Sequence, residues 1–71
     1  MEYYVTFNGR TVKIHKGGSG QCMNSYLVNH DIENVQIGGD EFYVIGSRYT
    51  TTFRRNGGGN YSFSRVKTSI N

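Results

Sequence analysis

The residues with the clearest chemical potential lie between positions 50 and 66, where the chain reads TTTFRRNGGGNYSFSRV. Arginines and aromatic residues stand on both sides of three consecutive glycines. Guanidinium groups bind phosphate, and exposed aromatic rings stack on unpaired bases. The pattern therefore predicts a basic and aromatic β-hairpin that binds nucleic acid or another polyanion.

Charge is distributed unevenly along the chain. Five positive residues and no acidic residue lie between Gly46 and Asn71, whereas the first 45 residues carry three positive and five negative charges. The net charge of +3 therefore comes from the C-terminal third, and a basic cluster of this kind is typical of polyanion binding. The predicted contact residues are Arg48, Tyr49, Phe53, Arg54, Arg55, Tyr61, Arg65 and Lys67.

The register of this hairpin leaves two interpretations open. If residues 57–59 form the loop, Phe53 faces Phe63, and rings and arginines share one face, which favours a binding surface. If the loop slips by one residue, Phe53 and Phe63 lie on opposite faces, and the arginines form an ordinary basic solvent face. Glycine-rich turns specify register weakly, so the sequence does not choose between the two.

Soft metal ligands are scarce in this chain. Its Cys and His residues are Cys22, His15 and His30. Structural zinc usually requires four ligands at paired short spacings, and no such spacing occurs here. We therefore expect no metal and no cofactor, and the single cysteine excludes an intramolecular disulfide.

No catalytic residue stands out, and we expect no enzymatic activity. The enzyme hypothesis that fits best is a small metal-free, ribonuclease-like toxin. In it, His15 or His30 would act as the acid or base. The phosphate would be held by Arg54, Arg55 or Lys67.

The elements that position these residues begin with a hairpin over residues 3–15, YYVTFNGRTVKIH. Asn8-Gly9 is a strong signal for a two-residue turn. The predicted pairs are Phe7 with Arg10, Val5 with Val12, and Tyr3 with Ile14. The apolar face of this hairpin holds Tyr3, Val5, Phe7, Val12 and Ile14.

Residues 16–21, KGGSGQ, end this hairpin. They lack the GK[ST] triplet of a phosphate-binding loop, so they predict a flexible connector. Apolar residues then recur at helical spacing, and we expect one short helix over about residues 20–30, with Ser19 as its N-cap. The helical stripe consists of Cys22, Met23, Tyr26, Leu27 and His30.

Residues 32–46 predict a second hairpin around Gly38-Gly39. A loop of two or of four residues gives the same facing, so the predicted faces do not depend on the loop length. One face holds Val35, Ile37, Phe42 and Val44. The other face holds Asn34, Gln36, Tyr43 and Ile45.

Residues 48–70 predict a third hairpin, which makes the expected order ββ-α-ββ-ββ. We expect the α+β class: a small twisted antiparallel sheet of five or six strands in three hairpins, with one short helix on its apolar face. The chain has 71 residues and no internal linker, so a single small domain over residues 1–71 is expected.

The function hypothesis is a small non-enzymatic binding module. Its C-terminal hairpin would bind nucleic acid or an acidic face of a protein or nucleoprotein complex, and homo-oligomers are compatible with this hypothesis. The alternative is a phage-type inhibitor that acts purely by docking to another protein. No segment reaches the roughly 20 apolar residues that span a membrane, and no signal peptide begins the chain. We therefore expect a protein of the cytoplasm (the host cytoplasm if a phage encodes it) with no membrane partner.

Overall fold

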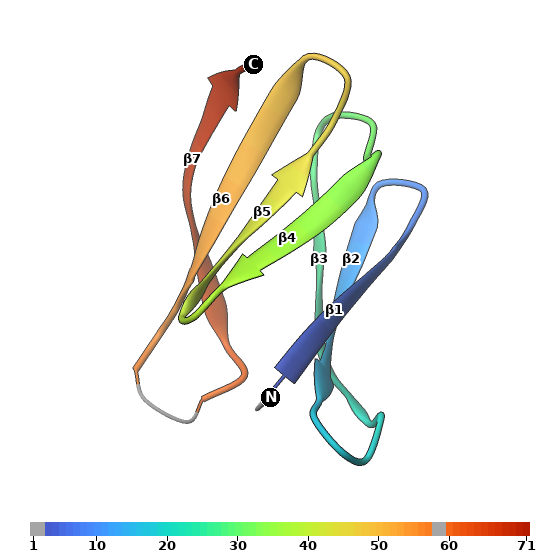
Figure 1. Cartoon of the computed structure of the whole chain (residues 1–71), viewed down its shortest axis with the longest axis vertical. Helices are drawn as coiled ribbons and strands as arrows, with labels where there is room; N and C mark the ends of the chain where they lie inside the picture. The colour runs from blue at the N-terminus through green and yellow to red at the C-terminus, as the bar shows by residue number, and fades with distance from the viewer. Residues whose placement is uncertain (1–2, 58–59) are drawn as a thin grey trace.

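The computed structural model of the chain describes residues 3–57 and 60–71. These residues form seven strands and no helix (Figure 1). The strands are β1 (Tyr3–Asn8), β2 (Thr11–Lys16), β3 (Cys22–Leu27), β4 (Asn34–Gly38), β5 (Glu41–Ile45), β6 (Tyr49–Arg55) and β7 (Phe63–Ile70). The expected α+β class with five or six strands is therefore wrong, because the described part of the chain is all-β.

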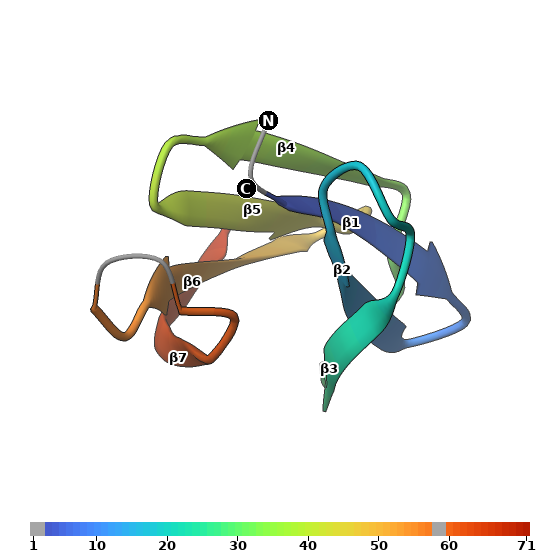
Figure 2. The ribbon, with the colours of Figure 1, turned by 90° about the horizontal axis from the view of Figure 1, so that it is seen from below.

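The strands form two antiparallel sheets, β1-β2-β3 and β4-β5-β6-β7. The sheets meet where β1 lies beside β4, and β3 and β7 are the outer strands on the other side (Figure 2). Side chains bridge these two outer strands. The Phe63 N–H donates to the Tyr26 hydroxyl at 2.8 Å, and the Arg65 guanidinium donates to the Leu27 carbonyl. We call the border between β3 and β7 the seam.

The predicted faces of the first hairpin are confirmed, but its predicted pairing is wrong. Val5 pairs with Ile14 instead of Val12, so each pair is displaced by two positions. The turn consists of Gly9-Arg10, in which Gly9 has a φ of +61°, as expected for a turn with glycine at its first central position. A displacement of two leaves the faces unchanged, because side chains alternate with a period of two.

The expected helix over residues 20–30 is wrong, because β3 pairs with β2. Between the pairs Ile14–Asn24 and His15–Cys22, β3 contains one residue more than β2. Such a β-bulge interrupts the alternation of side chains, which explains the poor period-two pattern of this segment. The pairing also satisfies backbone groups of β2 that a helix would leave at an exposed edge.

The predicted faces of the second hairpin are confirmed. Val35 pairs with Val44, and Ile37 pairs with Phe42. The chain reverses at Gly39, whose φ is +66°. The loop has two residues, Gly39 and Asp40, because Gly38 pairs with Glu41, and this fixes the register that the sequence left open.

The third hairpin has neither of the two predicted registers. Arg55 pairs with Phe63, and Phe53 pairs with Arg65, so the loop is longer than the three glycines. Residues 58 and 59 of that loop lie outside the described residues. Phe53 and Phe63 nevertheless share one face, as in the first of the two interpretations, because the displacement is again by two positions.

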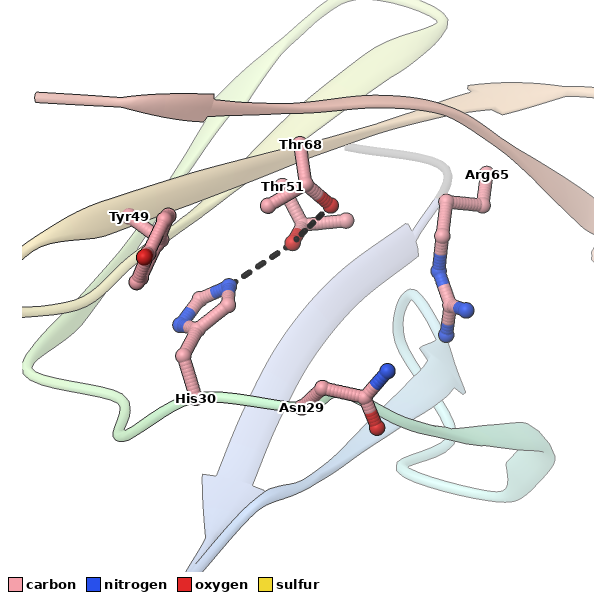
Figure 3. Close-up of a pocket in the computed structure, with 6 residues that line it drawn as sticks. All are labelled: Asn29, His30, Tyr49, Thr51, Arg65 and Thr68. Carbon is pink, nitrogen blue, oxygen red and sulfur yellow. Dashed lines mark hydrogen bonds between the residues drawn. The ribbon is translucent and has the colours of Figure 1, made fainter.

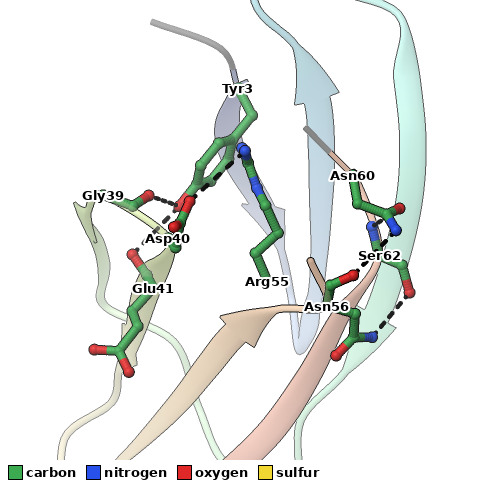
Figure 4. A network of polar contacts seen from close by, with 8 residues as sticks. All are labelled: Tyr3, Gly39, Asp40, Glu41, Arg55, Asn56, Asn60 and Ser62. Atoms are coloured by element: carbon green, nitrogen blue, oxygen red, sulfur yellow. Dashed lines mark hydrogen bonds and ion pairs between the residues drawn. The ribbon is translucent and has the colours of Figure 1, made fainter. Parts of the chain in front are cut away.

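The core lies between the two sheets. Its buried apolar residues are Tyr3, Val12, Ile14, Val28, Phe42, Val44, Phe53 and Phe63. The Phe42 and Phe53 rings stack with centroids 4.9 Å apart, and Tyr3 contacts Phe63 across the sheets at 5.0 Å. The Tyr3 hydroxyl donates to the Gly39 carbonyl at 2.8 Å (Figure 4). This hydrogen bond joins β1 to the β4–β5 turn.

Candidate functional site

Phe53, one of the predicted stacking residues, belongs to the core. Only 1% of its surface is exposed, and its ring contacts Phe42 and Tyr26 with centroid distances of 4.9 and 5.4 Å. Stacking of this ring on a base would require the two sheets to separate. Phe53 therefore stabilises the fold and is not accessible for stacking on a base.

Arg55 is also buried (Figure 4). Its side chain is 3% exposed, and its Nη1 forms an ion pair with the Asp40 carboxylate at 3.7 Å. The guanidinium carbon lies 4.8 Å from the centroid of the Tyr3 ring and 5.8 Å from that of Phe63. These contacts offset the cost of removing the charge from water, and they hold Arg55 away from a polyanion outside the protein.

Arg54 and Lys67 lie on the outer face of the four-stranded sheet. The Arg54 Nη2 forms an ion pair with Glu41 at 2.7 Å, and Lys67 pairs with Thr52 on the same face. Hydrogen bonds from Arg54 and Tyr43 hold the pKa of Glu41 below its ordinary value, and the Glu41 contact raises the pKa of Tyr43. The charge of Arg54 is thus largely balanced by a carboxylate.

Tyr61 and Arg48 lie apart from the residues above and from each other. Tyr61 is half-buried against the core, and its carbonyl accepts a hydrogen bond from the Asn24 amide at 3.5 Å. Arg48 is exposed in the turn after β5, and its carbonyl accepts from the Asn71 N–H at 2.7 Å. The structure therefore does not gather the eight predicted contact residues on one surface. It divides them between the core, the outer face, the turn after β5 and the seam.

Tyr49 and Arg65 are brought together at a polar pocket in the seam (Figure 3). The cavity has a volume of about 300 Å³. Its lining residues are Asn29, His30, Tyr49, Thr51, Arg65 and Thr68. It reaches the surface, because Asn29, Arg65 and Thr68 are exposed and 41% of Tyr49 is exposed. We call this cavity the seam pocket.

A β-bulge in β7 builds one wall of the seam pocket. Phe53 pairs with Arg65, and Thr51 pairs with Thr68, so β7 has one residue more than β6 over this stretch. Phe53 and Thr51 share the inner face of β6, so Arg65 and Thr68 also face inward. Without the bulge, residues 65 and 67 would share that face, as the sequence predicts. The bulge instead turns Lys67 outward.

His30 is the buried end of a chain of hydrogen bonds that leads to the pocket (Figure 3). It is 6% exposed. Its Nδ1 lies 2.8 Å from the Asp31 carbonyl, its Nε2 lies 2.7 Å from the Thr51 hydroxyl, and that hydroxyl lies 3.0 Å from the Thr68 hydroxyl. A carbonyl only accepts, so we assign the proton of the neutral imidazole to Nδ1. Thr51 then donates to His30, and Thr68 donates to Thr51.

The carboxylate of Asp31 fixes the turn that carries His30. It accepts hydrogen bonds from the Ser47 N–H and the Ser47 hydroxyl, both at 3.0 Å. These bonds, that of the backbone N–H first, hold the pKa of Asp31 below its ordinary value of 3.8. The loop after β3 is thereby tied to the β5–β6 turn.

An acid titration tests this link. A carboxyl group with a lowered pKa in the folded state stabilises the fold above its ordinary pKa, and this contribution disappears as the pH falls through the lowered pKa. We expect Asp31→Asn to reduce the urea midpoint more at about pH 7 than in acid, once the pH has fallen through the lowered pKa of wild-type Asp31. Glu33→Gln removes the same charge nearby without touching Ser47. An equal response of the two variants would contradict the role of Asp31.

Residues 3–57 and 60–71 contain neither a candidate metal cluster nor a membrane-spanning helix. No group of three or more His, Cys, Asp or Glu side chains there could hold a metal ion. The free thiol of Cys22 is exposed on β3, and His15 contacts Thr6 and the Gly20 carbonyl at 2.7 and 3.2 Å. No helix within these residues is long and apolar enough to cross a membrane.

Sequence reasoning missed four residues of the seam pocket: Asn29, His30, Thr51 and Thr68. His30 was considered as a residue of the helical stripe, a metal ligand or a nuclease base, and neither threonine was given a functional role. No local pattern could have found this set, because a bulge and the pairing of β6 with β7 create it. Asn29 and His30 follow β3, which the sequence predicted as a helix.

The described chain is thus a small all-β protein of two antiparallel sheets, with a basic and polar pocket where the sheets are not joined by backbone pairing. No protein-family profile, curated protein sequence or solved structure shows a significant match to it. The seam pocket is therefore the feature of this chain that points to a function.

Proposed function

We propose that this chain is a small binding module that acts without catalysis and holds nucleic acid at the seam pocket. One observation carries the proposal: an exposed aromatic ring, Tyr49, and an arginine, Arg65, line the same polar cavity. A guanidinium group holds a phosphate, and an exposed ring stacks on a base. The Asn29 amide and the Thr68 hydroxyl lie beside them and add neutral hydrogen-bonding groups.

The size of the pocket supports single-stranded nucleic acid as the ligand. A volume of about 300 Å³ lies at the lower end of small-molecule sites, so the cavity suits one nucleotide unit. Stacking on Tyr49 requires a base that is not paired. A duplex would present its phosphates but would keep its bases away from this ring.

Arg65 is held in position for such a contact. Its guanidinium carbon lies 5.5 Å from the centroid of the buried Phe53 ring, and one Nη donates to the Leu27 carbonyl. A guanidinium group has five N–H donors, so this bond leaves others for a ligand. By contrast, both ring nitrogens of His30 are hydrogen-bonded within the protein, which supports binding over the nuclease alternative.

Arg65→Gln is expected to weaken binding of a fluorescein-labelled oligothymidine by about 10-fold or more, because a charge-assisted hydrogen bond to phosphate is lost. The measurement is fluorescence anisotropy at about 50 and about 200 mM salt, where the wild type should show a steep loss of affinity. Arg54→Gln is the matched control. It removes the same charge from the outer face, where Glu41 already balances it, and should leave the affinity within about twofold.

Thermal melting of both variants separates binding from folding. A folded Arg65→Gln protein with wild-type affinity would exclude the seam pocket as the binding site. Equal losses in Arg65→Gln and Arg54→Gln would indicate binding through general positive charge alone.

A second candidate function is protein docking along β7. This strand is an outer strand of its sheet, and Val66 and Ile70 on it are 45% and 78% exposed. A partner strand could pair with its free edge. Such binding would depend little on salt, which distinguishes it from binding through phosphate contacts.

A further inference from the structure

The hydrogen-bond chain from His30 ends at a hydroxyl on the surface of the seam pocket. Thr68 is exposed, whereas Thr51 and His30 are buried. With neutral His30, the direction of the chain is set by the Asp31 carbonyl, and the Thr68 hydroxyl points its proton inward to Thr51. Thr68 then offers only its lone pairs to the pocket, and lone pairs repel an anion.

Protonation of His30 reverses this direction. Both ring nitrogens of an imidazolium ion are donors. The bond from Nδ1 to the Asp31 carbonyl is kept, but Nε2 now donates to Thr51. The Thr51 hydroxyl must turn its proton toward Thr68. The Thr68 hydroxyl can then point its own proton into the pocket and donate a hydrogen bond there. The pocket thereby gains one hydrogen-bond donor and a nearby positive charge.

We infer that the seam pocket contains a phosphate-binding subsite, formed by Arg65 and Thr68, whose affinity is controlled by the protonation of His30 through Thr51. This inference rests on the proposed function only for the source of the phosphate, which is the nucleic-acid backbone. Phosphate accepts hydrogen bonds on every oxygen atom, so the released Thr68 proton and the Arg65 guanidinium both favour it. Binding should strengthen when acidification protonates His30.

Charged and titratable groups lie near His30. The Asp31 carboxylate, which accepts two hydrogen bonds from Ser47, belongs to the next residue of the chain. Arg65 lines the same pocket as His30. Tyr49 contributes a ring at a centroid distance of 6.1 Å. An anion next to Arg65 offsets the repulsion between the two cations, so anion binding and protonation of His30 assist each other, as linkage requires.

Sulfate is the appropriate first probe, because its charge is constant over the titration of histidine. The test measures the sulfate affinity of the intact chain by NMR titration at about pH 8 and about pH 5.5. We expect binding to be about 10-fold tighter at the lower pH. The imidazole nitrogen signals report the tautomer directly, and at the higher pH they should show the proton of His30 on Nδ1.

Variants at Thr68 test the hydroxyl without disturbing the core, because this residue is exposed. Thr68→Val keeps the shape and removes the donor, so the gain in affinity at low pH should shrink severalfold. Thr68→Ser should keep the gain. Ser69→Ala, at the next position of β7, removes a hydroxyl outside the pocket and should leave the gain unchanged. His15→Gln removes the other histidine and should likewise have no effect.

The outcomes separate the inference from the proposed function. If oligothymidine binds at the Arg65 pocket but affinity is independent of pH, or if Thr68→Val keeps the full gain, the inference is overturned and the proposed function stands. If sulfate binds with the expected pH dependence and oligothymidine does not bind, the subsite is supported and the proposed function fails. A neutral His30 with its proton on Nε2 would also overturn the inference.

Discussion

Gly46→Ala is expected to lower the free energy of unfolding by about 3 kcal/mol or more, which approaches the whole stability of a chain of this length. A Cβ atom at Gly46 would lie 2.2 Å from the Asp31 carbonyl oxygen and 2.8 Å from His30 Nδ1. The first of these is a backbone atom, which cannot move by rotating a side chain. The Gly46 N–H also donates to the Tyr49 carbonyl at 2.8 Å, so the turn cannot simply shift away.

Gly38→Ala is the matched control for this experiment. Gly38 lies on β4, and a Cβ atom there would meet the Tyr43 ring at an ordinary distance of 3.7 Å. Urea denaturation, followed by far-ultraviolet circular dichroism, should show a large loss for Gly46→Ala and a change of less than about 1 kcal/mol for Gly38→Ala. Similar midpoints for the two variants would show that the loop carrying Asp31 does not lie against Gly46.

The same variant bears on the seam pocket. The Asp31 carbonyl that Gly46 accommodates is the acceptor that orients His30. Even where Gly46→Ala leaves part of the chain folded, the hydrogen-bond chain to Thr68 should be disrupted. In this variant, the imidazole signals of His30 are therefore expected to lose the Nδ1-protonated pattern of the wild type.

Phe53→Ala is expected to cost about 3 to 5 kcal/mol of stability, the range for truncating a buried phenylalanine. The ring is 1% exposed and stacks on Phe42. The ring also contacts the Arg65 guanidinium and the ring of Tyr26, which belongs to the other sheet. Its loss would leave a cavity at the centre of the contact between the sheets and remove the support of Arg65.

Two comparisons decide whether Phe53 acts in folding or in binding. Phe53→Leu retains most of the apolar volume and should keep both the fold and the affinity for oligothymidine, at a cost of about 1.5 kcal/mol. Tyr49→Ala truncates an exposed ring and should weaken binding by stacking energy of about 1 to 3 kcal/mol with little change in stability. A stable Phe53→Ala protein that has lost only its binding would contradict the core position of this ring.

Local patterns predicted the faces of the first two hairpins correctly. Tyr3, Val12, Ile14, Phe42 and Val44 were all placed on apolar faces, and all five are buried. Turn signals and alternation act within a few residues of one another, and an error of two positions in pairing leaves the faces unchanged. The pairing of the first hairpin was wrong for the same reason, because alternation cannot detect such a displacement.

The segment after the first hairpin shows where local patterns fail. Leu27, assigned to the apolar stripe of a helix, is 64% exposed, whereas Tyr26 packs against the core. A short apolar run with one bulge fits helical spacing as well as a strand. The segment forms a strand because it pairs with the backbone groups on the edge of β2. That edge exists only in the folded sheet, so the local sequence does not show it.

The candidate site depends most strongly on tertiary structure. The sequence by itself determined a basic C-terminal third, two hairpin faces and the presence of Tyr49 and Arg65 among the residues able to bind phosphate and bases. Only the folded chain decided that Phe53 and Arg55 are buried, that Arg65 and Lys67 point in opposite directions, and that His30 and Thr68 join one pocket. Charge and alternation are properties of neighbours along the chain, whereas a bulge and the contact of two sheets arise from strands that are distant in sequence.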